Sequence, residues 1–130
     1  MLKWILVIMV LLLLVGCASP KQKDASYRQI SMDEAIAMME AEEGYIILDV
    51  RTPEEFRDRH IPGAINIANE TIGTDEIPEL PDKEQLILVY CRSGNRSKQA
   101  SEKLAALGYT NIVEFGGIND WPGDVITGAE

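Results

Sequence analysis

The chain has few of the residues that build metal sites and disulfide frameworks. Its 130 residues include two cysteines, Cys17 and Cys91, and one histidine, His60. Zinc sites use three or four closely spaced protein ligands, mostly cysteine and histidine. No such spacing occurs here, and one histidine with one free cysteine cannot supply the set. We therefore expect no bound metal.

Basic residues are also outnumbered. Twelve lysines and arginines face 21 aspartates and glutamates, which gives a formal net charge of −9. Nucleic-acid binding depends on a basic face that contacts phosphates, so this balance argues against a nucleic-acid partner. The chain has no internal repeat and no low-complexity tract. Its length suits one domain with a single core, which we expect to be a monomer.

No apolar run is long enough to span a bilayer. After a basic start at Lys3, residues 4–15 are continuously apolar, which is shorter than the roughly 20 residues of a spanning helix. This length fits the core of a signal peptide. The segment Leu14-Val15-Gly16-Cys17 resembles the bacterial lipoprotein cleavage box. We predict a signal peptide over residues 1–16; an uncleaved short anchor with an incidental Cys17 is the alternative.

The N-terminal pattern predicts an extracytoplasmic protein, anchored by lipid to a bacterial membrane on its periplasmic side or at the cell surface. More than one acyl chain on Cys17 would make anchoring stable. Residues 17–26 would supply the lipidated cysteine and a flexible tether, and the domain would occupy residues 27–130. Cys91 is then the last thiol in the mature chain. An unpaired cysteine outside the cytoplasm is a candidate reactive group.

The rest of the chain alternates between strand-like and helix-like segments. Strands are predicted at 27–30, 45–50, 64–67, 86–90 and 111–115, and helices at 31–42, 53–59, 75–80 and 97–107. This alternation favours an α/β fold with a mainly parallel sheet of about five strands and helices on both faces. Functional residues in such sheets lie beyond the carboxyl ends of strands. Asp49, Arg51 and Cys91 all occupy such positions.

The segment Cys91-Arg-Ser-Gly-Asn-Arg-Ser97 links an apolar strand to a helix and carries more chemistry than a connection needs. Gly94 permits a tight turn in which successive N–H groups can form an anion-binding nest. The helix N-terminus, Arg92 and Arg96 would all favour the thiolate form of Cys91. One loop would thus supply both a nucleophile and an anion cradle. The alternative is a buried structural thiol beside a solvated basic helix face.

This loop resembles the active-site loop of single-domain rhodaneses, the thiosulfate sulfurtransferase family. The segment 48–56 and the following segment 60–66 resemble the family's second signature, and Gly116-Gly117 with Trp121 resembles its usual ending. The resemblance covers residues 27 to 121. Two separate motifs in the same order as in the family make it specific.

The resemblance implies sulfur transfer in two steps. Cys91 would take a sulfane sulfur from thiosulfate or a similar small anionic donor, and the persulfide would pass it to cyanide, a thiol or a sulfur-accepting protein. No cofactor is required. The substrate-binding residues carried over are Arg92, Ser93, Gly94, Asn95, Arg96 and Ser97, with the two arginines on the anionic end of the donor. From their positions we further expect Asp49 to order the loop without acting as a catalyst, and Arg51 to pair with a nearby acid.

Two other functions remain open. The first is a phosphatase or an arsenate reductase. Tyrosine-type phosphatases place five residues between cysteine and arginine, and relatives of the rhodanese fold with phosphatase or arsenate reductase activity likewise have the longer loop. Four residues separate Cys91 from Arg96, and the smaller ring suits a sulfur atom better than a phosphate. The second alternative is a carrier or anion-binding module without useful turnover, because no second cysteine is present to release the sulfur.

We interpret His60 as a structural turn residue and Trp121 as a residue that packs in the core or at its rim. Glu54 and Glu55 are interpreted as first-turn acids that face the helix dipole.

Overall fold

The computed structural model describes residues 26–129. The predicted signal peptide and the lipidation site at Cys17 lie outside these residues. Five strands are present: β1 (Arg28–Gln29), β2 (Ile46–Asp49), β3 (Ile65–Asn66), β4 (Ile87–Cys91) and β5 (Ile112–Gly117). The helices are α2 (Met32–Ala41), α3 (Pro53–Asp58) and α4 (Asn95–Ala106), with short 3-10 turns η1 (Asn69–Thr71) and η2 (Ile118–Asp120).

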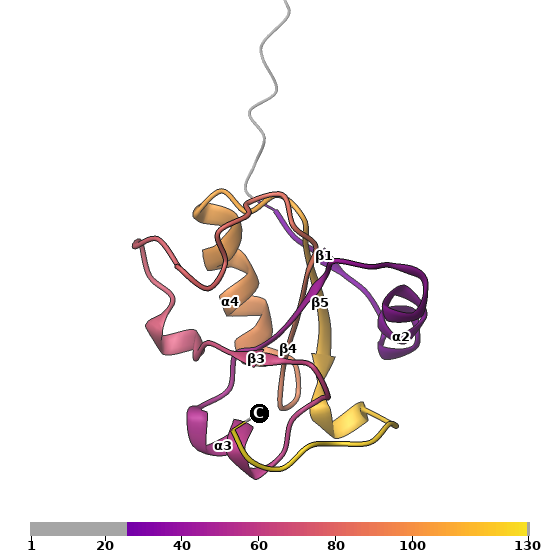
Figure 1. Ribbon diagram of the computed structural model, residues 1–130. Coiled ribbons are helices and arrows are strands. Elements are labelled where there is room, and N and C mark those ends of the chain that lie inside the picture. The colour runs from indigo at the N-terminus through magenta and orange to yellow at the C-terminus, as the bar shows by residue number, and fades with distance from the viewer. Residues whose placement is uncertain (1–25, 130) are drawn as a thin grey trace, which may run out of the picture.

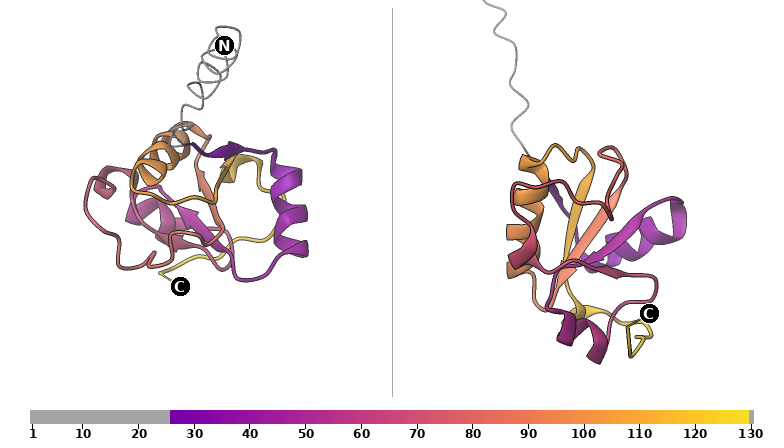
Figure 2. Two further views of the ribbon diagram at one scale, coloured as in Figure 1. Left: turned by 90° about the horizontal axis from the view of Figure 1, so that it is seen from above. Right: turned by 60° about the vertical axis from the view of Figure 1, so that its left-hand side comes forward.

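The five strands form one sheet in the order β1-β5-β4-β2-β3, and every pair in it is parallel (Figure 1). α4 lies on one face of the sheet and α2 on the other, as the views in Figures 1 and 2 agree. This arrangement confirms the predicted α/β class. Within residues 26–129, no helix has the length and apolar character needed to cross a bilayer.

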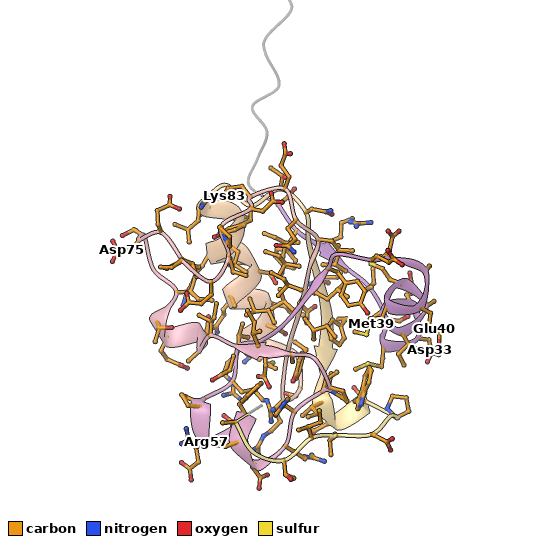
Figure 3. All side chains as sticks on the ribbon, in the orientation of Figure 1. Asp33, Met39, Glu40, Arg57, Asp75 and Lys83 are labelled. Carbon is orange, nitrogen blue, oxygen red and sulfur yellow. The ribbon has the colours of Figure 1, made fainter. Side chains whose placement is uncertain are left out.

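Each face of the sheet has its own core, visible as side chains filling the space between ribbons in Figure 3. On the α4 face, Leu104 and Ala100 pack against Val89 and other strand residues, with Leu107 partly buried beside them. On the opposite face, Ala35 of α2 and Phe56 of α3 pack in a second core. β4, central and wholly buried, contributes to both. The continuous apolar run of this strand therefore follows from its two covered faces.

Two helix predictions need correction. α4 begins at Asn95, not Ser97, because Gly94 turns the chain with a φ of 112° and serves as the N-cap. Residues 75–80 do not form a helix. Ile77 precedes Pro78, and a residue before proline is sterically pushed out of the helical region.

The strand ends bring the predicted site residues to one edge of the sheet. Cys91 closes β4 and pairs in register with Gly117 of β5, across an irregularity in the ladder. Asp49 closes β2 opposite Tyr90. The loop after β4, the loop after β2 and η2 therefore meet at the same carboxyl edge.

Candidate active site

Cys91 lies beneath the loop that follows β4, and its residue is 1% exposed. The backbone N–H of Gly94 donates a hydrogen bond to Cys91 Sγ over 3.0 Å, and Ser97 Oγ lies 3.4 Å from the same sulfur. Burial alone would raise the pKa of the thiol. Hydrogen bonds from the Ser97 side chain and from the amides of Ser97, Gly94 and Ser93 outweigh burial, so the pKa of Cys91 lies below its ordinary value. The loop thus stabilises a thiolate.

Two glycines allow the loop to close so tightly. Gly94 adopts a left-handed φ, which residues with a Cβ rarely tolerate. Gly117 lies directly against the backbone of the loop: a Cβ at this position would clash with the Arg92 carbonyl and the Ser93 amide. The Arg92 carbonyl also accepts a hydrogen bond from the Asn119 N–H at 3.2 Å. β5 and η2 therefore hold the loop from outside the segment itself.

A buried carboxyl group, that of Glu114, lies behind Cys91. Ser97 Oγ lies 2.7 Å from Glu114 Oε1, and the same carboxyl oxygen accepts the Gly116 N–H over 2.8 Å. The Ser97 hydroxyl has one hydrogen, which rotates to donate either to Glu114 or to the sulfur of Cys91. Ser97 is fully buried and Glu114 is 3% exposed. Sequence reasoning missed Glu114, although one signal was present: it is the single acid in an otherwise apolar strand. Its effect is to fix the Ser97 hydroxyl between β5 and the sulfur.

Both loop arginines contact one carboxylate on α3. Glu55 accepts two hydrogen bonds from Arg96, over 2.6 and 3.0 Å, and pairs with Arg92 Nε at 3.3 Å. Glu55 also closes the capping box of α3 with Thr52. The hydrogen bonds from Arg96, outweighing partial burial, lower the pKa of Glu55 to about 2. Glu55 is therefore more than a first-turn acid: it joins α3 to the loop.

Asp49 and Arg51 form a buried ion pair. Arg51 binds Asp49 through Nε and Nη2, the shortest contact being 2.6 Å, and Nη2 also donates to the Arg59 carbonyl over 2.6 Å. Asn66 donates to the backbone carbonyls of both residues. The pair holds the segment after β2, which carries α3 and hence Glu55. The ion pair therefore does not contact the loop directly in these bonds, but it helps to position α3, whose Glu55 does.

His60 and Trp121 have packing contacts. The His60 ring is fully buried, stacks on Phe56 with ring centroids 3.8 Å apart, and its Nδ1 lies 2.9 Å from the Phe56 carbonyl. The backbone of His60 forms an isolated bridge with Ile126. Trp121 packs partly buried against the core on the α2 face, and its Nε1 donates to the Asp124 carbonyl. These contacts agree with the structural roles predicted for both residues.

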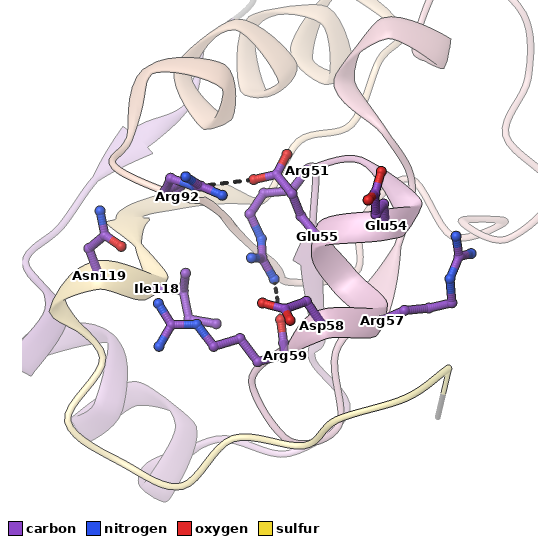
Figure 4. Close-up of a pocket in the computed structure, with 9 residues that line it drawn as sticks. All are labelled: Arg51, Glu54, Glu55, Arg57, Asp58, Arg59, Arg92, Ile118 and Asn119. Atoms are coloured by element: carbon purple, nitrogen blue, oxygen red, sulfur yellow. Dashed lines mark hydrogen bonds and ion pairs between the residues drawn. The ribbon is translucent and has the colours of Figure 1, made fainter.

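A pocket of about 590 Å³ opens beside the loop, between α3 and η2 (Figure 4). Glu55 and Arg92 belong both to this pocket and to the ion-pair cluster at the loop. The other lining residues are Arg51, Glu54, Arg57, Asp58, Arg59, Ile118 and Asn119. The pocket volume is within the range of roughly 300–1,000 Å³ that small-molecule sites occupy.

Comparison with known proteins identifies the family and the fold. The rhodanese-like domain family matches residues 31–124, which include the whole sheet from β2 to β5 and the loop. The chain belongs to the rhodanese-like domain family. This rhodanese-like domain is homologous to thiosulfate sulfurtransferases.

Relatives include short and long proteins. Thiosulfate sulfurtransferase PspE of Escherichia coli is 40% identical over 73 residues, which cover 56% of this chain and 70% of PspE. Thiosulfate sulfurtransferase GlpE of Tolumonas auensis is 28% identical, with 75% of this chain and 90% of GlpE covered. The adenylyltransferase and sulfurtransferase UBA4 of Candida albicans is 35% identical over 75% of this chain, which spans only 24% of UBA4.

Solved structures show the same architecture as this rhodanese-like domain. A rhodanese with anions from E. coli has a TM-score of 0.59 and 36% identity, covering 65% of this chain and 99% of its own. The rhodanese-like domain of an Anabaena protein, solved by NMR, has a TM-score of 0.70 and 26% identity, covering 80% and 82%.

Proposed function

We propose that this rhodanese-like domain is a sulfurtransferase that carries sulfane sulfur as a persulfide on Cys91. One observation supports the proposal most directly: the sulfur of Cys91 lies in a cradle of backbone amides that also lowers its pKa. A nucleophile needs this activation, and a persulfide anion needs these donors. The family relationship supports the same reaction class.

In the first step, Cys91 thiolate attacks the outer sulfur of the donor. With thiosulfate, the new Cys91 S–S bond forms as the S–S bond of the donor breaks, and its electron pair leaves with sulfite. Cys91 then carries a persulfide anion. The inward N–H groups of the loop, including that of Gly94, would stabilise this charge.

In the second step, a nucleophile takes the outer sulfur. Cyanide would leave as thiocyanate, and a thiolate would leave as a persulfide; in both cases the electron pair of the broken S–S bond returns to Cys91. Cys91 is the only free cysteine among the described residues, so the acceptor comes from outside the domain. A small thiol and the thiol of another protein are both candidate acceptors.

A carrier that takes up sulfur without turning it over is the second candidate. The burial of Cys91, at 1% exposure, favours it, because an acceptor must reach a sulfur covered by its own loop. Measuring the mass of the protein after the donor, and again after a small acceptor, separates the enzyme from the carrier. Both should form the persulfide, but only the enzyme should lose its outer sulfur rapidly to the acceptor.

The test uses the full-length chain and a Cys91→Ser variant. Incubation with thiosulfate should add one sulfur atom to the Cys91 peptide, as intact and peptide mass spectrometry can show, and cyanide should remove it. The Cys91→Ser chain should gain nothing. A sulfur atom that cyanide and thiols leave in place would indicate a carrier, and no adduct from thiosulfate or organic sulfane donors would refute the persulfide proposal.

We also propose that residues 1–16 act as a lipoprotein signal peptide and that Cys17 is lipidated, so that the domain lies outside the cytoplasm. The apolar run after Lys3 and the small residues before Cys17 support this proposal.

A further inference from the structure

The charge at the mouth of the site is smaller than the loop alone suggests. Arg92 and Arg96 supply two positive charges, and Glu55 pairs with both of them. The three groups together carry +1. Glu55 therefore cancels half of the positive charge that the two arginines would otherwise present to a donor anion.

Glu55 is held firmly in this position. Its carboxylate accepts two hydrogen bonds from Arg96 and further ones from the Thr52 backbone and hydroxyl, and its side chain is 18% exposed. Arg92 uses only Nε and Arg96 only Nη1 and Nη2 in these pairs, so each guanidinium keeps further N–H donors for a ligand. Glu55 thus neutralises one charge and leaves donors available.

We infer that Glu55 biases this site toward sulfur donors that carry a single negative charge, which are organic thiosulfonates and organic persulfides, and against the thiosulfate dianion. The inference rests on the proposed sulfur-transfer function and specifies its substrate class. A binding site discriminates between ligands partly by leaving a charge of the disfavoured ligand without an opposite charge to pair with. Thiosulfate would remain a substrate, used less efficiently than its charge would allow at a site with two free arginines.

The pocket beside the loop provides room for the organic part of such a donor. It adjoins the cluster through Glu55 and Arg92, and Ile118, itself almost fully buried, lies at its wall among charged side chains (Figure 4). Its volume of about 590 Å³ far exceeds what the sulfonate end of thiosulfate needs. We place the organic group of the donor in this space between α3 and η2, beside the two residues that also pair at the loop.

Atoms, electrons and charge balance in the transfer from both types of donor. Cys91 thiolate attacks the terminal sulfur, and the Cys91 S–S bond forms as the donor bond to that sulfur breaks. The electron pair leaves on a sulfinate from a thiosulfonate, or on a thiolate from a persulfide anion. Two negative charges are present before and after the step, and no oxidant or reductant is consumed.

Anion binding tests the inference without requiring turnover. The full-length chain, labelled with ¹⁵N, is titrated with sulfate and with methanesulfonate at constant ionic strength, and the Gly94 amide resonance reports binding. Removing one charge about 6 Å away in a water-like dielectric should tighten a monoanion about threefold and a dianion about tenfold. Glu55→Gln should therefore shift the sulfate-to-methanesulfonate affinity ratio about threefold toward sulfate. Glutamine can still close the capping box.

Glu34→Gln is the matched control. Glu34 closes the capping box of α2 with Ser31 as Glu55 does that of α3, so the change in charge and local structure is the same without the contact to the loop arginines. Its affinity ratio should equal that of the wild type. An unchanged ratio in Glu55→Gln, or an equal shift in both variants, would overturn the inference while leaving the persulfide proposal standing.

Kinetics with two donors provide the second readout. In Glu55→Gln, kcat/KM for thiosulfate should rise about threefold relative to kcat/KM for methanethiosulfonate. In the wild type, benzenethiosulfonate should be used at least as well as methanethiosulfonate, because its ring has room in the pocket. A loss of more than tenfold with the larger donor would contradict the assignment of the pocket.

Discussion

At Cys91, burial and hydrogen bonding act on the thiol in opposite directions. A buried thiol with no donors around it would remain protonated at neutral pH. Here the Gly94 amide and the Ser97 side chain approach the sulfur, and the pKa falls below its ordinary value. Ser97 is itself oriented by Glu114. The reactivity of one atom therefore depends on a hydroxyl in α4 and a carboxylate in β5.

Replacing Ser97 should move the titration of Cys91 to higher pH. Only the thiolate reacts with iodoacetamide, so the alkylation rate rises with pH through the pKa of the thiol. The wild-type midpoint should lie below that of an unperturbed cysteine measured under the same conditions. Ser97→Ala removes one stabilising hydrogen bond, and its midpoint should lie above that of the wild type. Peptide mass spectrometry resolves the Cys91 peptide and gives its rate at each pH.

Ser93→Ala is the control for this measurement. The Ser93 side chain is exposed, whereas its backbone amide supplies the stabilisation, so the substitution should leave the midpoint in place. Equal midpoints for the wild type and Ser97→Ala would show that the amides alone set the pKa.

At the scale of elements, α3 and the start of α4 are joined by charge. Glu55 of α3 pairs with Arg96 in the first turn of α4, and the buried pair of Asp49 and Arg51 fixes the segment that leads into α3. α3 has only six residues, too few to be stable alone. Its capping box, Phe56 in the core and the bond to Arg96 hold it against the sheet.

Glu55→Gln should destabilise the domain at pH 7 by about 1–2 kcal/mol, since a partly exposed charge-assisted pair is lost and a neutral amide remains. The folded-state pKa of Glu55, about 2, lies below the ordinary 4.5. Its contribution is therefore complete above pH 4.5 and lost as the pH falls toward 2. Urea denaturation should show the gap between wild type and variant at pH 7, narrowing at pH 3 and closing near pH 2.

Other carboxylates also titrate between about pH 2 and 4.5. The result is therefore read from the difference in the free energy of unfolding between the wild type and each variant at the same pH. Glu34→Gln, at the same capping position of α2, should show a smaller gap at pH 7. A gap for Glu55→Gln that persists at pH 2 would mean that packing, not charge, joins α3 to α4.

For the whole molecule, local patterns determine most of the fold, and contacts between distant segments determine the site. Ser31 and Thr52 mark the starts of α2 and α3 through capping boxes, and apolar runs mark β2, β4 and β5. The rhodanese motifs located the loop. The pair of Glu55 and Arg96, 41 residues apart, has no local signature, because each residue is ordinary in its own helix.

The same limit applies to charge. Counting along the sequence makes Arg92, Arg96, Lys98 and Lys103 a basic island on an acidic chain. In the fold, Lys103 Nζ binds Asn69 in η1, away from the sulfur, and Glu55 enters from α3. The charge that a donor meets depends on which segments the sheet brings together, and the pairing of Glu55 with the two arginines is the basis on which we infer a bias toward monoanionic donors.

The direction of the strands predicts how an anchored domain would present its site. β1 is parallel to β5, and β5 to β4, so the chain enters β1 at the edge of the sheet opposite Cys91. A lipid on Cys17 would be attached to that far edge through the predicted tether, so the attachment point would lie away from the loop. If Cys17 is lipidated, the wild-type chain produced in bacterial cells should incorporate an alkyne-labelled fatty acid, and the Cys17→Ser chain should not. If the anchor lies away from the loop, kcat/KM for a small soluble donor should be the same in both proteins. Cys91→Ser should show the reverse pattern: full labelling and no sulfur transfer.

Label that is retained in Cys17→Ser, or absent from the wild type, would contradict the proposed anchor. A change of more than about threefold in kcat/KM between the wild type and Cys17→Ser would contradict the orientation that the strands imply.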